Sequence, residues 1–310
     1  MTKTLLFVCT LFVINNHVFS QYESDTTAID DIDSYTGEEG ESNDLIEGTF
    51  NSTRVINGHS TETLDKKMLE FRVEHRFGDM AGDQGGAQQM YGFDNVADIR
   101  LAFEYGITDH LMIGIGRSKG TGAPYRSLMD GFTKYKLLSQ KKTGMPISLS
   151  IQGSTSYTYM KKIEDVSQIA HFPEWQHRLA YSLQMSIAKK LGDRLSLLLA
   201  PSIVHRNYVG LDDVNTLFAM GGAARFAIKP TMSLIVEYYH VLADQDIRSL
   251  NTNSLGFAIE FETFGHVFTI NLTNSKGFGE TQFIPYTYEK WSKGQYRLGF
   301  TIGRGYIIGH

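Results

Sequence analysis

The sequence predicts an all-β protein, a transmembrane antiparallel up-and-down β-barrel of about 12 strands. Alternation of apolar and polar residues with period two dominates from Lys67 onward. Tight turns alternate with long polar loops between the expected strands, and the chain begins with an export signal. After that signal, no apolar run reaches the roughly 18 residues of a membrane helix. A hydrophobic content of 42% excludes a wholly disordered chain.

Residues 1–20 have the features of a cleaved secretory signal peptide. Lys3 is followed by an apolar core from Leu5 to Ile14, and Val18 and Ser20 occupy the −3 and −1 positions of a cleavage site after Ser20. A buried strand or a short anchor is the alternative. The single cysteine, Cys9, lies within this segment, which excludes a disulfide scaffold and any cysteine-based metal or catalytic centre.

Residues 21–50 form an acidic segment that we expect to be a flexible tail. It contains ten acidic residues and no Lys or Arg, so it has too little apolar surface to order itself. The remaining chain is mildly basic and could attract the tail, or the tail could simply be solvated. A periplasmic partner could bind through it. Residues 51–66 are then a periplasmic lead-in, and residues 67–310 form the barrel.

The expected strands are recognised by their alternation. In Leu69–Phe77 every even position is charged, which a soluble half-buried strand could also show. Ile147–Tyr159 alternates without a break, longer than an ordinary globular strand and long enough for a tilted membrane strand. The expected strands span residues 67–77, 96–107, 111–118, 129–138, 146–159, 176–190, 195–208, 216–229, 232–241, 253–263, 266–275 and 294–304.

The connections divide into two classes that alternate along the chain. The tight turns are 108–110, 139–144, 192–194, 230–231 and 264–265. The long polar loops are 78–95, 119–128, 160–175, 209–215, 242–252 and 276–293. Outer-membrane barrels have short periplasmic turns and longer extracellular loops, whereas a soluble sandwich has no reason for this order. This alternation of turns and loops implies an even number of strands, with both chain termini on the side of the tight turns.

The outward positions suit a lipid environment. Leu179, Tyr181, Leu183, Met185 and Ile187 on one expected strand are all apolar or aromatic. Tyrosines near strand ends fit an aromatic girdle at the membrane interface, namely Tyr105, Tyr135, Tyr157, Tyr159, Tyr238 and Tyr296.

The sequence also resembles a family of predicted bacterial outer-membrane β-barrels that is classed as a domain of unknown function. The residues that carry the resemblance are Thr49–Ser60, Leu69–Arg72, His75–Gly78, Asp98–Arg100, Glu104–Asp109 and Asp130–Phe132. It covers roughly residues 48–310, most specifically at its opening segment. The resemblance implies the barrel and its location, and it implies no activity.

Three groups of residues suggest other chemistry. Gly114, Gly116 and Gly120 lack the spacing and the following helix of a dinucleotide-binding loop. His171, Glu174 and His177 lie on a loop, where their spacing does not bring metal ligands together. His177, His205 and Asn207 could belong to a membrane-embedded hydrolase, but no serine in outward phase accompanies them.

The inward positions hold eight acids and ten bases. Because charges that face lipid near the midplane cost a few kcal/mol each, we expect them to line the lumen. There they could line a narrow pore or pair with one another and close it, and the nearly balanced count favours pairing. The residues are Glu70, Arg72, Glu74, Arg76, Asp98, Arg100, Glu104, Asp130, Lys134, Lys136, Arg178, Arg206, Arg225, Lys229, Glu237, Glu260, Glu262 and Arg297.

These observations predict a channel or transporter for small polar solutes in the bacterial outer membrane. A closed barrel that anchors or scaffolds a partner protein is the alternative, and a membrane-embedded hydrolase is the third hypothesis. The expected contacts are outer-membrane lipid and a small polar solute. We expect no cofactor, no metal, no enzymatic activity and no nucleic-acid partner.

Overall fold

The computed structural model describes residues 45–46, 48–95, 98–120, 126–210, 213–243, 248, 250–263 and 265–308. The expected signal peptide and most of the expected acidic tail, residues 1–44, lie outside the described residues.

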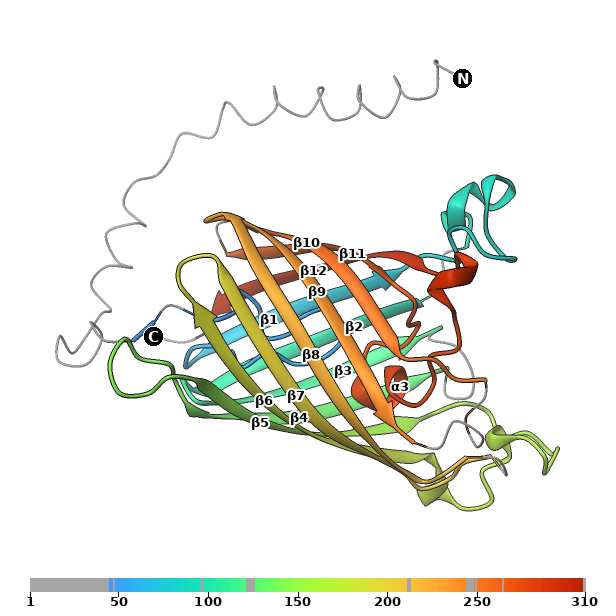
Figure 1. The fold of residues 1–310 in the computed structure, drawn as a ribbon. Coiled ribbons are helices and arrows are strands. Elements are labelled where there is room, and N and C mark those ends of the chain that lie inside the picture. The colour runs from blue at the N-terminus through green and yellow to red at the C-terminus, as the bar shows by residue number, and fades with distance from the viewer. Residues whose placement is uncertain are drawn as a thin grey trace, which may run out of the picture. The chain divides into compact units, whose positions relative to one another are not determined.

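The described chain forms a closed antiparallel barrel in which every strand pairs with its sequence neighbours and the first pairs with the last (Figure 1). Its strands are β1 (Met68–Arg76), β2 (Asp98–Thr108), β3 (Leu111–Lys119), β4 (Leu128–Leu138), β5 (Ser148–Thr158), β6 (Leu179–Leu191), β7 (Leu195–Arg206), β8 (Thr216–Lys229), β9 (Met232–Leu242), β10 (Ser254–Thr263), β11 (His266–Thr273) and β12 (Arg297–Ile307). The predicted all-β barrel of 12 strands is confirmed, and every predicted strand overlaps its observed counterpart.

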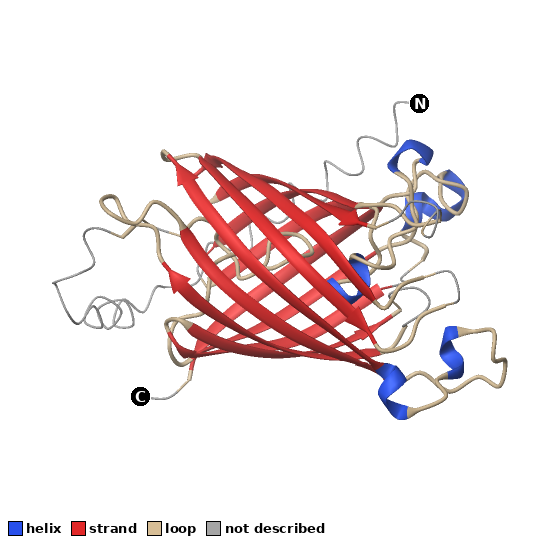
Figure 2. Ribbon diagram, turned by 60° about the horizontal axis from the view of Figure 1, so that its bottom comes forward, coloured by secondary structure: helices blue, strands red, loops and turns tan. Residues whose placement is uncertain are grey.

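The two classes of connection lie at opposite ends of the barrel. The turns β2–β3, β4–β5, β6–β7, β8–β9 and β10–β11 share one end with the beginning of β1 and the end of β12, where Met68 pairs with Ile307. We call this the turn end and the opposite one the loop end. Figure 2 shows the inclined strands and the short helical segments beyond the loop end. Within the described residues no helix is both long and apolar enough to span a membrane.

Alternation along each strand separates an apolar outer surface from the interior. In β2, Leu101 and Phe103 are 41% and 50% exposed, whereas Ala102 and Glu104 between and beside them are fully buried. The period of two places successive side chains on opposite faces of the wall. The outer face therefore presents large apolar side chains, as a barrel surrounded by lipid requires.

The interior is divided into a charged part and an apolar part. The inward residues of β1 and β2 are mainly Glu, Asp and Arg. By contrast, β7, β8 and β9 point Leu198, Val204, Leu217 and Ile235 into the barrel, and these belong to one buried apolar cluster. Phe50, Val55, Ile56, Phe283 and Ile284, which come from outside the strands, complete that cluster. Segments that are not part of the wall therefore fill the lumen.

We predict that an outward leucine tolerates arginine according to its place along β6. Leu183→Arg puts a charge in the middle part of the strand, where burial in lipid costs about 2–4 kcal/mol, whereas Leu191→Arg puts it at the strand end, where the cost is about 0–1 kcal/mol. Both leucines are exposed on the outer face. Heat-modifiability and folding yield in detergent should fall for Leu183→Arg alone, and equal losses would contradict the assigned lipid face.

Candidate functional site

Residues 49–62 form a hairpin inside the barrel, here called the plug hairpin. Its two limbs pair through a bridge between Arg54 and His59, and the Ser60 amide donates to the Thr53 carbonyl at 3.0 Å. The Val55 amide donates to the Gly58 carbonyl at 2.9 Å and closes the tip. Nearly all of its residues are buried. The sequence predicts a periplasmic lead-in over residues 51–66, and this prediction is corrected for residues 51–62, because the barrel wall supplies partners for their polar groups. Residues 63–66 lead into β1 at the turn end, where Thr63 and Lys66 bond Asp109.

Glu237 of β9 binds the tip of the plug hairpin. Its carboxylate accepts the backbone N–H groups of Ile56, Asn57 and Gly58 at 3.0, 2.9 and 3.1 Å. It also accepts the Asn57 side-chain amide at 2.8 Å. Glu237 is 2% exposed, so these donors replace the water that a buried carboxylate would otherwise need.

Close packing fixes the tip against the wall. A Cβ at Gly58 would stand 1.9 Å from the hydroxyl oxygen of Tyr239, so only glycine allows this approach. The Tyr239 hydroxyl donates to Gln184 at 3.0 Å, and Gln184 in turn donates to the His59 carbonyl at 2.9 Å. The wall on both sides of the tip is therefore matched to the backbone of the hairpin.

Lys134 of β4 binds the carbonyl groups of the two limbs. Its ammonium donates to the carbonyl oxygens of Thr53, Ser60 and Glu62 at 2.7, 3.3 and 2.7 Å. The side chain is fully buried, and these three bonds use all three of its donors. Glu237 thus binds backbone amides of the hairpin, and Lys134 binds backbone carbonyls of the same hairpin.

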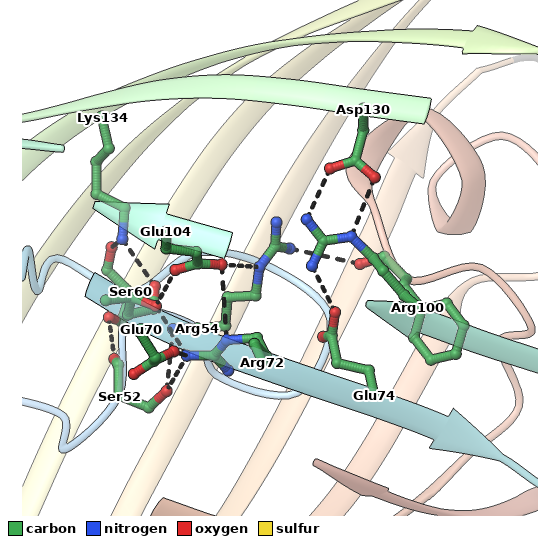
Figure 3. Close-up of polar contacts among 12 residues, drawn as sticks. Ser52, Arg54, Ser60, Glu70, Arg72, Glu74, Arg100, Glu104, Asp130 and Lys134 are labelled. Atoms are coloured by element: carbon green, nitrogen blue, oxygen red, sulfur yellow. Dashed lines mark hydrogen bonds and ion pairs between the residues drawn. The ribbon is translucent and has the colours of Figure 1, made fainter. Parts of the chain in front are cut away.

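A cluster of charges joins the plug hairpin to β1 and β2 (Figure 3). Arg54 of the hairpin and Arg72 of β1 lie 3.7 and 3.6 Å from Glu104 of β2, which also accepts the Thr53 hydroxyl at 2.8 Å. Arg72 donates to the hydroxyls of Ser52 and Thr53 at 2.9 Å and pairs with Glu70 at 2.6 Å. The hairpin therefore contributes a cation and several hydroxyl groups to a network whose other members are wall residues.

Wall charges also pair with one another, without the hairpin. Arg100 of β2 contacts Glu74 of β1 at 2.6 Å and binds Asp130 of β4 through two bonds of 3.0 and 2.6 Å. A Cβ at Gly116 of β3 would lie 2.7 Å from the Arg100 guanidinium, so this glycine gives Arg100 room to reach across β3. The glycine-rich stretch around Gly116 thus has a packing role.

The turn-end part of the hairpin is fixed by Glu62. It pairs with Lys136 at 2.9 Å, and the Thr49 amide donates to it at 2.9 Å. Burial alone would raise the pKa of Glu62, but the Lys136 charge and the hydrogen bonds from Lys136 and Thr49 hold that pKa below its usual value. Glu62 is therefore ionised at neutral pH.

The connection between β11 and β12 closes the lumen from the loop end. It contains α3 (Glu280–Phe283), which contacts β6 and β7 and lies among the strands in Figure 1. Phe278, Phe283 and Ile284 are buried, and Arg54 donates to the Phe278 carbonyl at 3.5 Å. The Arg76 guanidinium also donates to the Ser275 carbonyl at 3.0 Å. The connection and the plug hairpin thus meet inside the barrel.

The structure places most of the predicted lumen residues inside the barrel, with three exceptions. Arg178 precedes β6 in a short 3-10 turn, Trp175–Arg178, where it donates to the carbonyls of Thr158 and Met160. Its prediction as a strand residue is wrong, because β6 begins at Leu179. Lys229 and Glu262 are exposed at the turn end. The others are buried, or partly buried and paired with an opposite charge: Glu70, Arg72, Glu74, Arg76, Asp98, Arg100, Glu104, Asp130, Lys134, Lys136, Arg206, Arg225, Glu237, Glu260 and Arg297.

The histidines that suggest metal binding or hydrolysis in the sequence have separate local partners. His171 bonds the Ile163 carbonyl, the Glu174 amide donates to His177, and His205 bonds the Thr216 hydroxyl. Asn207 donates to the Gln176 carbonyl. In the described part of the chain, no group of three His, Cys, Asp or Glu side chains is placed to hold a metal ion.

The functional residues that sequence reasoning missed are those of the plug hairpin. Thr53, Arg54, Asn57 and His59 bind the wall, but they were assigned to a lead-in outside it. The Asn57-Gly58 pair between Val55-Ile56 and His59 was the available signal, because Asn-Gly flanked by such residues favours a turn in a hairpin.

Comparisons with known proteins agree with the fold. A family model described as a membrane-bound β-barrel domain (DUF5777) matches residues 50–306. No curated protein matches the sequence.

Several solved barrels show distant similarity. The NanC porin has 10% identity and a TM-score of 0.46 over 78% of this chain and 100% of its own. The KdgM porin in complex with disordered oligogalacturonate has 8% identity and a TM-score of 0.46, over 76% of this chain and 98% of its own. The toluene transporter TodX of P. putida has 6% identity and a TM-score of 0.39, over 80% of this chain and 91% of its own. These values are too low to carry an argument about what this chain does.

We predict that acidification weakens the inserted state of the plug hairpin through His59. Burial, and then the charges of Arg54, Lys134, Arg100 and Arg72, lower the pKa of His59 well below its usual value. Glu104 faces the same cluster but is engaged by Arg54 and Arg72. Neither ring nitrogen of His59 has a hydrogen-bond partner in the described residues.

When the hairpin is released, the pKa of His59 returns to about 6.5. His59 then binds a proton that it does not bind in the inserted hairpin. The insertion free energy is therefore complete above about pH 6.5, and it falls by about 1.4 kcal/mol for each pH unit below that value. NMR of labelled histidine should show His59 neutral at pH 6, with His59→Gln identifying its signal. Titration of His59 near pH 6.5 would contradict the buried, unprotonated ring.

Proposed function

Because the chain belongs to the family of membrane-bound β-barrel domains, we propose that it is an outer-membrane channel for small polar solutes whose lumen the plug hairpin closes at rest. The chain reaches that membrane by export through its signal peptide. Conduction then requires both the plug hairpin and the β11–β12 connection that meets it to shift away from the wall. The observation that carries the proposal is the way in which the wall charges Lys134 and Glu237 are neutralised.

Both side chains are buried, and both are satisfied mainly by the hairpin. Lys134 binds three hairpin carbonyls, and Glu237 binds three hairpin amides and the Asn57 side chain. In an open lumen, water could take over these bonds, since water hydrates an ammonium and a carboxylate well. Removing the hairpin therefore leaves these two charges open to hydration, and a continuous passage also requires the β11–β12 connection, which closes the loop end, to move aside.

The second candidate is a closed barrel that anchors or scaffolds a partner protein. The filled lumen of the described residues favours it, since a scaffold has no need of a passage. The polar character of the contacts between hairpin and wall favours the channel, because a permanently closed lumen could be packed with apolar side chains at lower desolvation cost. Hydrolysis gains no support, since His177 and His205 have unrelated partners.

Conductance in a planar bilayer tests the channel against the scaffold. Glu237→Gln replaces one acceptor oxygen by an NH₂ group facing backbone donors, at a cost of about 2 kcal/mol to the inserted hairpin. We expect its open probability to rise about 30-fold over that of the unmodified chain. Glu260→Gln is the matched control, because it changes a buried glutamate on the adjacent strand that makes no hydrogen bond to the hairpin.

A chain that lacks residues 49–62 and in which a short Gly-Ser linker replaces residues 277–286 should conduct continuously, once its heat-modifiability shows a folded barrel. If that deletion and Glu237→Gln both fold and neither conducts above the unmodified chain, the barrel is a closed scaffold and the channel proposal fails.

A further inference from the structure

A polar cavity of about 810 Å³ lies at the turn end, between the plug hairpin and the wall. The hairpin side is formed by Phe50 and Asn51, preceded by Gly48. The wall side comes from the β6–β7 turn, from the end of β8 and from Glu262 of β10. The volume lies within the range of small-molecule sites.

The charges that line this cavity are predominantly basic. Lys190, Arg194, Arg225 and Lys229 contribute four cations, and Asp193 and Glu262 contribute two acids. Lys229 and Arg194 are exposed at the rim, whereas Arg225 is only 5% exposed and lies deeper on β8. A basic rim that leads to a buried guanidinium attracts anions and directs them inward.

The cations in this cavity are less fully paired than Arg72, Arg100 and Lys134 elsewhere in the lumen. Arg72 and Arg100 have short carboxylate contacts, and Lys134 binds three carbonyls. Within the described residues, no ion pair involves the side chain of Lys190, Arg194 or Lys229, and the buried Nε of Arg225 has no well-formed hydrogen bond. Arg225 contacts an acid only through Glu260, at 3.6 Å.

A buried guanidinium whose only acidic neighbour lies 3.6 Å away is incompletely satisfied, and an anionic ligand can supply further acceptors. Guanidinium groups present a planar fork of donors that suits the paired oxygens of carboxylate and phosphate. The surrounding lysines add compact charges, and Asn51 adds an amide beside them.

We propose that this cavity is a binding site for small organic anions that carry a carboxylate or phosphate group, with Arg225 as the central contact and Lys229 at its entrance. This assignment rests on the proposed channel function for its physiological meaning, since it names the solute class that would reach the closed hairpin from the turn end. A bound anion would lie beside Phe50 and Asn51, at the base of the plug hairpin.

Calorimetric titration of the full chain in detergent tests the site with glucuronate and glucose, two probes that differ at one carboxylate. At low ionic strength we expect glucuronate to bind and glucose to give no signal. Raising the salt from about 0.05 to 0.3 M should weaken the binding severalfold, because the rim charges are screened.

Two variants locate the site. Lys229→Gln changes an exposed side chain and should weaken glucuronate binding about fivefold, whereas Arg225→Gln should weaken it at least tenfold and Arg225→Lys less. Lys119→Gln, an exposed charge at the loop end, is the matched control and should leave the affinity unchanged. Equal binding of glucose and glucuronate, or unchanged affinity in Lys229→Gln and Arg225→Gln, would overturn the proposal.

The titration uses the plugged chain and measures no current, so its outcome is independent of the channel test. Conductance in Glu237→Gln without glucuronate binding would overturn the anion site and leave the channel intact. Glucuronate binding without conductance in any plug variant would overturn the channel and leave the anion site intact.

Discussion

A charge inside a membrane barrel must be neutralised within the barrel, because the surrounding lipid offers neither water nor counterions. Glu237 and Lys134 meet this requirement through the plug hairpin, whose backbone amides and carbonyls they bind. The dependence is mutual. The hairpin forms no ladder with the wall strands, so several of its buried backbone groups, among them the amides of Ile56 and Asn57, would lack partners without these two side chains. The other features of the lumen follow from this reciprocal arrangement.

The remaining contacts orient the hairpin between two unlike parts of the wall. Toward β1 and β2, Arg54 joins a charged network around Glu104, while Val55 and Ile56 pack against the apolar interior of β7–β9. A hairpin with an apolar side and a cationic side fits this lumen in one orientation. The connection that carries α3 then covers the tip from the loop end, where Arg54 meets the Phe278 carbonyl.

The sequence was sufficient to predict the barrel because its wall obeys a single rule. Alternation with period two places Leu101 and Phe103 outside and Glu104 inside, and it predicted the twelve strands with small errors at their ends. Alternation also found the charged residues Arg72, Arg100 and Asp130, which pair inside the barrel with charges on β1, β2 and β4. It failed at Arg178, where the pattern continues past the strand into a 3-10 turn.

Alternation could not predict the plug hairpin, since no periodic pattern distinguishes a short polar segment inside a barrel from one outside it. Thr53, Asn57 and Ser60 are typical of loops, and their partners Glu237 and Lys134 lie about 180 and 70–80 residues away in sequence. The inward apolar residues Leu198, Leu217 and Ile235 were a missed indication, since an open aqueous lumen has no use for them. Hydrogen exchange in lipid nanodiscs measures the central claim most directly. The amides of Ile56, Asn57 and Gly58 should be protected to a degree similar to those of β9, and exchange at the rate of an unstructured peptide would contradict the inserted hairpin.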